Sequence, residues 1–153
     1  MVTIGTPVEP FGAVEKWTQI VPLVLMYGAF GPKSVDRILT KALLGSDAVA
    51  SQPIQARVTM DEFRQADRQA KLRAMRCLMV RRRSLSGQVS QISCPTLLLV
   101  PEGGQEGWTP AESAAVARRM KNAALETLPG AGNMAPLLLA AGLIAERLRT
   151  FWG

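Results

Sequence analysis

The sequence has 153 residues, of which 48% are hydrophobic and 20% are charged. This length and composition are typical of one globular domain with enough apolar material for a core, and they exclude a disordered chain. Lysine and arginine outnumber the acidic residues and leave a net charge of +6. No uninterrupted apolar stretch reaches the ~18 residues that cross a bilayer, so we expect no membrane span.

The sequence contains no pattern typical of export or metal binding. The apolar run of residues 20–30 is short, contains Pro22 and follows acidic residues, which is not the order of a signal peptide. We therefore expect a cytoplasmic protein. Cys77 and Cys94 are expected to be reduced and buried. Because the chain has no histidine and no Cys-x-x-Cys pair, we expect no metal site and no cofactor.

The first helical signals follow a short N-terminal strand. Residues 1–4 (MVTI) predict that strand, and residues 14–30 predict a helix that Pro22 kinks or divides. A second helix is expected to begin at Ser34, whose hydroxyl can cap it. It is expected to end at Gly45 in a left-handed conformation.

A longer helix is expected after a polar connector at residues 46–55. Thr59 and Glu62 have the spacing of a capping box, which predicts the start of a helix that extends to residue 84. Its buried face is predicted from residues that recur at helical spacing: Met60, Phe63, Ala66, Ala70, Ala74, Cys77 and Leu78.

The second half of the chain predicts alternating strands and helices. Residues 95–100 (PTLLLV) form a continuous apolar run, which indicates a strand buried on both faces. A helix capped by Thr109 and Glu112 follows, then a strand at 124–128 and a final helix at 135–152. The final helix is expected to bury one face: Leu137, Ala141, Ile144, Leu148 and Phe151. This order predicts a parallel α/β unit.

Basic residues are concentrated in one part of the chain. Residues 57–83 contain nine basic and three acidic side chains, and the remainder of the sequence is neutral. Such a segment can form a face for nucleic acid, an acidic protein or an anionic surface, or it can simply be solvated. Phe63 is its only aromatic residue, so stacking on nucleic-acid bases has little support.

Two segments of the second half form a specific pattern: ISCPTLLLVPEGGQEGWTP at 92–110 and LETLPGAGNMAPLL at 125–138. They resemble the C-terminal half of the α/β-hydrolase superfamily. The resemblance implies an α/β fold class, namely a partial α/β-hydrolase fold with a short parallel sheet of two to three strands and a helical cap-like segment. Residues 1–10 would resemble the sixth strand of the family, 11–91 its cap, and 92–153 its C-terminal subdomain.

Three departures from the family pattern concern catalysis. No Gly-x-Ser-x-Gly elbow is present, because Ser84, Ser86 and Ser90 have no flanking glycine pair. Gly104 stands where the family has its acidic residue, and Asn133 stands where it has histidine. An amide nitrogen is not basic near neutral pH, and the loss of a triad member typically costs about 10⁴- to 10⁶-fold in rate. The resemblance therefore implies no intact catalytic residue.

Neighbouring residues allow more than one interpretation. Glu102 and Glu106 could supply a carboxylate near this site, or they could be two exposed loop residues. Asn133 could also be an ordinary turn residue, because asparagine tolerates left-handed backbone angles and bonds to its own turn. Trp108 could line a pocket or pack beside the capping Thr109.

Three functional hypotheses remain. The leading one is a truncated hydrolase-like chain, a pseudoenzyme without hydrolytic activity of its own. In the second, the chain is the C-terminal half of a split hydrolase that needs an N-terminal partner chain. The unpaired edge of the strand at residues 1–4 could alternatively support self-association. In the third, residues 57–83 form a basic face that binds a partner, with nucleic acid the least supported.

Overall fold

The computed structural model describes all residues except 105–107. Its sheet has three parallel strands in the order β1-β2-β3, with bounds Val2–Ile4, Thr96–Pro101 and Ala123–Leu128. Thr3 of β1 pairs with Leu98 of β2, which pairs in turn with Leu125 of β3. The predicted short parallel sheet is therefore confirmed.

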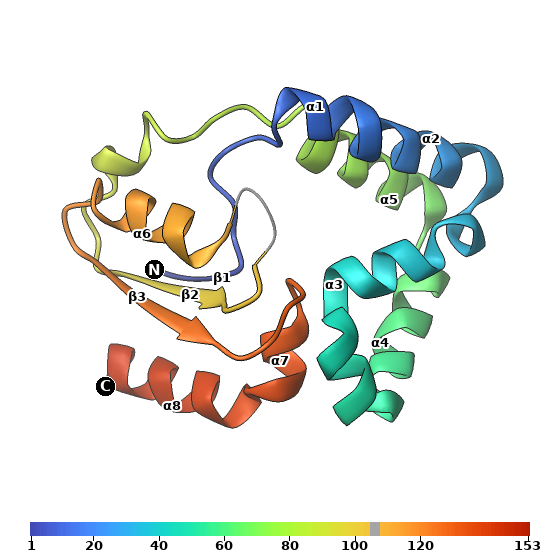
Figure 1. The fold of residues 1–153 in the computed structure, drawn as a ribbon. Helices are drawn as coiled ribbons and strands as arrows, with labels where there is room; N and C mark the ends of the chain where they lie inside the picture. Colours follow the sequence, from blue (N-terminus) through green and yellow to red (C-terminus); the bar gives the residue numbers. More distant parts are fainter. Residues whose placement is uncertain (105–107) are drawn as a thin grey trace.

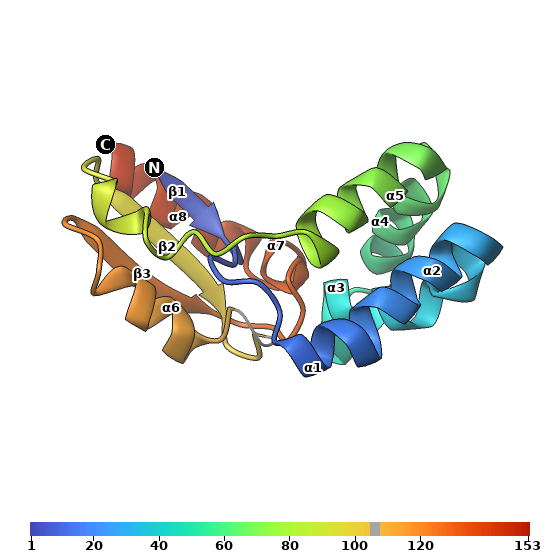
Figure 2. The same cartoon turned by 90° about the horizontal axis from the view of Figure 1, so that it is seen from above.

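Helices cover both faces of this sheet (Figures 1 and 2). They are α6 (Pro110–Ala117), with a short 3₁₀ turn at Val89–Gln91, and α8 (Ala141–Trp152); α7 (Ala135–Leu139) lies between α8 and the helix at Asp36–Ser51. On the α6 side, Leu98 and Val100 pack with Met120. On the α8 side, Leu97 and Leu99 pack with Ile144. The side chains of β2 point alternately to the two faces of the sheet, and helices cover both faces. Every residue of β2 is therefore buried, as predicted.

The caps of this layer agree with the sequence at one helix and differ at another. Thr109 Oγ1 accepts a hydrogen bond from the Glu112 backbone N–H at 3.3 Å, and the Glu112 carboxylate accepts one from the Thr109 N–H at 2.8 Å. The predicted single C-terminal helix is instead divided at Ala140, whose φ of −133° is not helical. As a result Leu137 and Ala141 are exposed, contrary to expectation, whereas Ile144 is buried.

The residues between β1 and β2 form a layer of helices beside the sheet (Figure 1). The first is continuous from α1 (Ala13–Glu15) through a π-helical turn (Lys16–Ile20) into α2 (Val21–Phe30). Pro22 has no N–H and would clash with a carbonyl of the preceding α-helical turn. The π-helical turn changes the spacing of that carbonyl, so the proline neither ends nor divides the helix.

The second helix is broken at Gly45, where the sequence predicts its end, and a further helical segment follows directly. α3 extends over Asp36–Ser51, and Gly45 interrupts it with φ 73° and ψ 167°. The positive φ at Gly45 is confirmed, but helical turns resume after it, so the connector predicted at 46–55 is wrong. Ser34 does not cap the helix, because its hydroxyl donates to the carbonyl of Gly31 at 2.7 Å in the preceding 3₁₀ turn (Pro32–Ser34).

The predicted long helix consists of two helices with different boundaries. α4 extends over Pro53–Gln65, and α5 over Arg68–Met75 and on through a π-helical turn, Arg76–Val80. Thr59 lies inside α4, so the predicted capping box is wrong. Asp67 instead caps α5, where its carboxylate accepts a hydrogen bond from the Ala70 N–H at 2.6 Å.

The break before Asp67 rotates α5 relative to α4. Leu72 and Met75 are consequently buried, whereas several predicted face residues are exposed: Ala66, Ala70, Ala74, Cys77 and Leu78. The expectation of buried cysteines is wrong as well, since both Cys77 and Cys94 are exposed free thiols.

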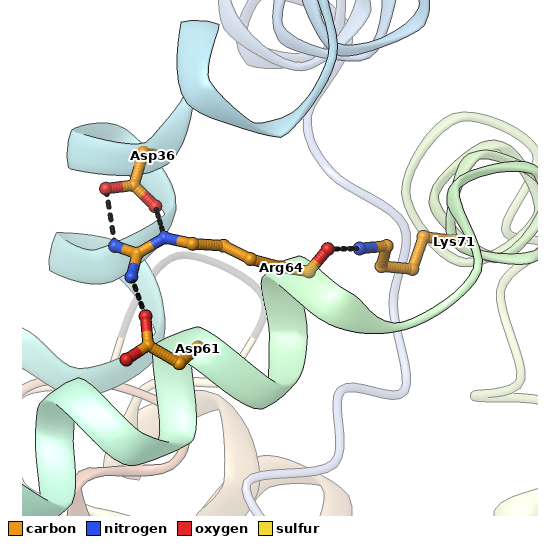
Figure 3. A network of polar contacts seen from close by, with 4 residues as sticks. All are labelled: Asp36, Asp61, Arg64 and Lys71. Carbon is orange, nitrogen blue, oxygen red and sulfur yellow. Dashed lines mark hydrogen bonds and ion pairs between the residues drawn. The ribbon is translucent and has the colours of Figure 1, made fainter.

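Arg64 connects three helices of this layer (Figure 3). Its guanidinium donates from Nε and Nη2 to the two carboxylate oxygens of Asp36 on α3, at 2.9 and 2.8 Å, and from Nη1 to Asp61 on its own helix. Lys71 of α5 donates to the carbonyls of Phe63 and Arg64. The hydrogen bond with Asp36 is the largest cause that raises the pKa of Arg64, so the guanidinium remains charged.

Two connections join the helical layer to the sheet, and they run side by side. The Leu85 N–H donates to the Val8 carbonyl at 3.0 Å, and Arg82 Nη1 donates to the Glu9 carbonyl at 3.3 Å. The Arg82 guanidinium also lies 5.6 Å from the centre of the Phe11 ring. Desolvation by burial lowers the pKa of Arg82.

Within the described part of the chain, no helix has both the length and the apolar character needed to cross a bilayer.

Candidate functional site

The carboxyl ends of the three strands meet at one edge of the sheet, where each strand runs into a glycine-containing turn. Gly5 follows β1, and its N–H donates to the Leu99 carbonyl of β2 at 2.9 Å. Gly103 follows β2, and its N–H donates to the Gly130 carbonyl after β3 at 3.0 Å. The turn that contains Gly103 and Gly104 and the loop that contains Asn133 therefore touch directly.

Asn133 lies in the loop after β3, between the sheet and α3. Its N–H donates to the Ala42 carbonyl at 3.4 Å, and the next N–H, from Met134, donates to the Leu43 carbonyl at 2.7 Å. On the sheet side, a Cβ placed on Gly5 would lie 3.3 Å from the Asn133 carbonyl oxygen. The loop thus attaches the helical layer to the ends of the strands.

Asn133 does lie in a turn, but neither of the two physical reasons for an asparagine there applies. No non-glycine residue of the described part has a positive φ; the left-handed residue of this loop is Gly130, with φ 121°. The side-chain Oδ1 of Asn133 is buried and accepts no hydrogen bond from any described residue. A carboxamide oxygen can accept a hydrogen bond, but it cannot take the proton of a nucleophile.

Gly104 occupies a position with no room for a side chain. A Cβ at this residue would lie 2.5 Å from the Trp108 carbonyl oxygen and 3.2 Å from the Thr109 Cα. Both are backbone atoms that cannot rotate away, so an aspartate at 104 would require the turn to move. The backbone itself is therefore arranged for glycine at the family's acidic position.

The structure describes all but one of the other candidate residues. Glu102 is exposed, as in the simpler of its two interpretations, and Glu106 lies outside the described residues. Trp108 is only 9% exposed, and its indole N–H has no acceptor among the described residues. Ser84, which is exposed, and Ser86, which is partly buried, lie with their hydroxyls 2.9 Å apart in a connection between the two layers, and both form hydrogen bonds with the Glu9 carboxylate. Ser90 is also exposed.

A cavity of about 40 Å³ lies against the sheet, lined among others by Thr3, Leu98 and Val116. Pockets for organic ligands are usually about 300–1,000 Å³, so this cavity is too small for a substrate. Among the described residues, no three histidine, cysteine or acidic side chains are grouped so that they could hold a metal ion.

Sequence reasoning missed the contact that fixes the loop. A Cβ on Gly132 would lie 2.5 Å from the Leu43 carbonyl oxygen and 2.6 Å from the Gly45 nitrogen. The two glycines are distant in the sequence, and the only signal for their contact is that each stands in a turn beside a helix. The unpartnered oxygen of Asn133 has no sequence signal.

Comparison with known proteins identifies the fold. No family model and no curated protein matches the chain. Among solved structures, a thermophilic esterase from Thermogutta terrifontis matches 99% of this chain with a TM-score of 0.82 and 18% identity, over 54% of its own length. The enol-lactonase from Burkholderia xenovorans LB400 matches 99% with a TM-score of 0.81 and 15% identity, over 55% of its length.

An α/β hydrolase from a deep-sea metagenome library of the Medee basin also matches, with a TM-score of 0.68 and 13% identity, over 55% of its length. The chain thus spans about half the length of these proteins. At such low identity the comparison concerns the fold alone. The three-stranded parallel sheet and its helical layer have the arrangement of about half of the α/β-hydrolase fold, consistent with its C-terminal half.

Proposed function

We propose that this chain supplies the cap and the C-terminal part of the sheet of an α/β-hydrolase-type protein, and that it has no hydrolytic activity by itself. One observation carries the proposal. The loop after β3, where the family has its general base, carries Asn133, and the whole sequence contains no histidine. The absence of an imidazole anywhere in the chain means that no rearrangement can restore the usual base.

The neighbouring positions support the same conclusion. A triad needs a nucleophile, a base within hydrogen-bond reach of it and an acid that orients the base. The acidic position is Gly104, where the backbone leaves no room for a carboxylate. None of the serines considered as nucleophiles lies on a strand-to-helix elbow.

The test is an esterase assay on the purified chain. We expect hydrolysis of p-nitrophenyl acetate and butyrate to proceed at the rate of buffer that contains an equal concentration of the heat-denatured chain. The variant Asn133→His, and the same change combined with Gly104→Asp, are expected to remain inactive, because neither adds a nucleophile. Turnover by the unaltered chain that disappears on substitution of a single serine would refute the proposal.

A second candidate function follows from the outer edge of β1. Among the described residues β1 pairs along one edge only, with β2, and no described strand pairs with its other edge. Such an edge can accept a strand from another chain. A separately encoded chain with a serine elbow could pair there and form an assembled hydrolase, acting on esters or lactones if it follows the matched enzymes.

This candidate predicts that the two chains co-purify and that hydrolysis of an ester appears only in their mixture. Replacing Ile4 by proline should abolish the association, because residues 1, 3 and 5 direct their backbone groups to β2, so the N–H of Ile4 points to the outer edge and proline cannot donate there. The alternative occupant of the edge is a second copy of this chain. Analytical ultracentrifugation would then show a dimer of about 33 kDa, twice the 16.5 kDa of one chain. A strictly monomeric chain that binds no second polypeptide would contradict both forms of edge pairing.

A further inference from the structure

The helix formed by α1 and α2 is apolar on two opposite sides. Residues 17–32 (WTQIVPLVLMYGAFGP) contain no charged side chain. One side of this helix lies in the core of the helical layer and includes Ile20, Leu23, Val24 and Tyr27. The opposite side is exposed. A helix that is hydrophobic all round is normally buried all round, so an exposed apolar side of this kind indicates an interaction surface.

The exposed apolar residues of α2 share one side of the helix, because their spacing is that of neighbouring turns. Leu25 follows Pro22 by three positions and precedes Ala29 by four, and residues at these spacings lie next to each other on a helix surface. Met26 is four positions from Pro22 and three from Ala29. All four residues are exposed, Leu25 to 62% and Met26 to 40%.

The exposed side continues at both ends of α2. Phe30 is 77% exposed and follows Met26 by four positions. Trp17 is 67% exposed and lies two turns before Leu25, with Val21 on the turn between them. The turn is π-helical, since the Val21 N–H pairs with the Lys16 carbonyl, and residues four apart still lie nearly above each other. We define the outer stripe as six residues: Trp17, Pro22, Leu25, Met26, Ala29 and Phe30.

The outer stripe and the outer edge of β1 are separate surfaces. Figure 2 shows α5 on the side of the helical layer toward β1, and α2 on the side toward β3. A chain that pairs with the edge of β1 would therefore approach α5 before α2. Among the described residues, no element covers the outer stripe.

The pattern of the outer stripe is complementary to itself. In a two-fold dimer, each contact between two positions occurs twice. If two α2 helices lie antiparallel about an axis between Leu25 and Met26, each Leu25 faces Met26 of the second copy. Each Pro22 then faces Ala29 of the second copy, and these short side chains allow close approach on both sides of the larger pair. No charged side chain is buried, because residues 17–32 contain none.

The outer stripe is large enough for a specific interface. Aromatic side chains bury about 150–250 Å² each, so Trp17 and Phe30 at their exposed fractions offer roughly 300 Å². The four aliphatic residues add roughly 200 Å². Two copies would together bury about 1,000 Å², which reaches the lower limit for a specific protein–protein interface.

We propose that this chain forms a two-fold dimer through the outer stripe, with the two α2 helices antiparallel. The inference is independent of the proposed hydrolase-like function, which the esterase assay tests. It also differs from pairing at the edge of β1, because the two interfaces share no residue.

The first experiment is analytical ultracentrifugation of the full chain over a range of concentrations. We expect a dimer of about 33 kDa, twice the 16.5 kDa of one chain. Leu25→Glu should raise the Kd of the dimer at least about 100-fold, because two unpaired carboxylates would be buried close to the axis. The control Ile54→Glu makes the same change of charge on α4 at a residue that is 67% exposed, and it should change the Kd less than about threefold.

Charge complementation tests the two-fold arrangement. With the axis beside Leu25, the two copies of this position are offset by only about 1.5 Å along the helices. Leu25→Glu and Leu25→Lys should each be monomeric alone, whereas their equimolar mixture should form a dimer. Both changes are at an exposed side chain, so the far-UV circular dichroism of each variant should equal that of the unaltered chain.

Disulfide cross-linking tests the register of the two helices. Cys77→Ser and Cys94→Ser provide the background, because both native thiols are exposed. In this background Leu25→Cys should form a covalent dimer when copper phenanthroline and dioxygen oxidise the thiols. Ala29→Cys is the matched control. Its two copies would be offset by about 10 Å along the antiparallel helices, beyond the ~7 Å between Cα atoms that a disulfide spans.

Three results would overturn the proposal. The first is a chain that stays monomeric at about 100 µM, above the micromolar Kd of weak interfaces, including a monomer whose outer stripe binds lipid vesicles or another polypeptide instead. The second is a dimer that Leu25→Glu leaves intact and Ile4→Pro abolishes, which would be the edge-paired form. The third is equal cross-linking of Leu25→Cys and Ala29→Cys.

Discussion

The contact between Gly132 and the kink of α3 leads to a quantitative prediction. Replacing Gly132 by alanine would place a methyl group 2.5 Å from the Leu43 carbonyl oxygen and 2.6 Å from the Gly45 nitrogen. Normal contacts of carbon with these atoms are more than 3 Å, and both belong to the backbone. The loop and α3 must therefore separate.

The cost has two parts. Overfilling a packed site typically costs about 1–3 kcal/mol. Separation would also lengthen the hydrogen bond from Met134 N–H to the Leu43 carbonyl, now 2.7 Å, which contributes about 1 kcal/mol. We expect Gly132→Ala to lower the free energy of unfolding by about 2–4 kcal/mol. For a chain of this size, this corresponds to a decrease in Tm of about 5–15 °C.

The assay is urea denaturation and thermal melting followed by circular dichroism. Gly142→Ala is the matched control, because a Cβ at Gly142 of α8 meets no atom within 4 Å. This second substitution should leave the protein unchanged or stabilise it by up to about 1 kcal/mol, since alanine loses less backbone entropy in a helix than glycine. Gly132→Ala melting within about 1 °C of the unaltered chain would refute the packing argument.

Three further predictions concern polar groups. Tyr27→Phe should leave stability unchanged or raise it by up to about 1 kcal/mol in urea denaturation, because the buried hydroxyl has no partner among the described residues; a loss above 1 kcal/mol would contradict this. Arg64→Ala should lower the free energy of unfolding by about 1 kcal/mol in urea denaturation, a small value because solvent screens the partly exposed ion pairs of Arg64. Arg73→Ala removes no ion pair among the described residues and should lower it by less than about 0.5 kcal/mol. Hydrogen bonds from Ser84, and to a smaller extent from Ser86, lower the pKa of the Glu9 carboxyl group below its usual value of 4.5. The ionised carboxylate should therefore stabilise the fold fully above pH 4.5, and this stabilisation should disappear as the pH falls through the lowered pKa of the folded state. A Glu9→Gln variant that loses the same free energy of unfolding at pH 3 and at pH 7 would contradict this.

The sheet layer could be predicted well because its signals are local and agree with one another. The apolar run of β2 requires burial on both faces, and Thr109 with Glu112 caps α6 as the spacing predicts. In the helical layer, local signals competed. Thr59 and Glu62 have capping spacing, but Pro53 starts a helix six residues earlier, so the Thr59 amide already has an intrahelical partner. Nothing but Asp67 marked the break between α4 and α5.

The candidate site was predictable in its outline. Parallel strands bring their carboxyl ends to one edge, so the contact between the turns at Gly103 and Gly130 follows from the strand order. The unpartnered oxygen of Asn133 and the steric exclusion at Gly104 could not be predicted, because both depend on how the loops pack in three dimensions.

The central claim is that this chain has no nucleophile activated for hydrolysis. The most direct measurement is covalent labelling of the purified chain with a fluorophosphonate probe, followed by mass spectrometry and compared with a heat-denatured sample. We expect no labelling of the folded chain above that of the denatured chain. Stoichiometric labelling of one serine in the folded chain alone would contradict it.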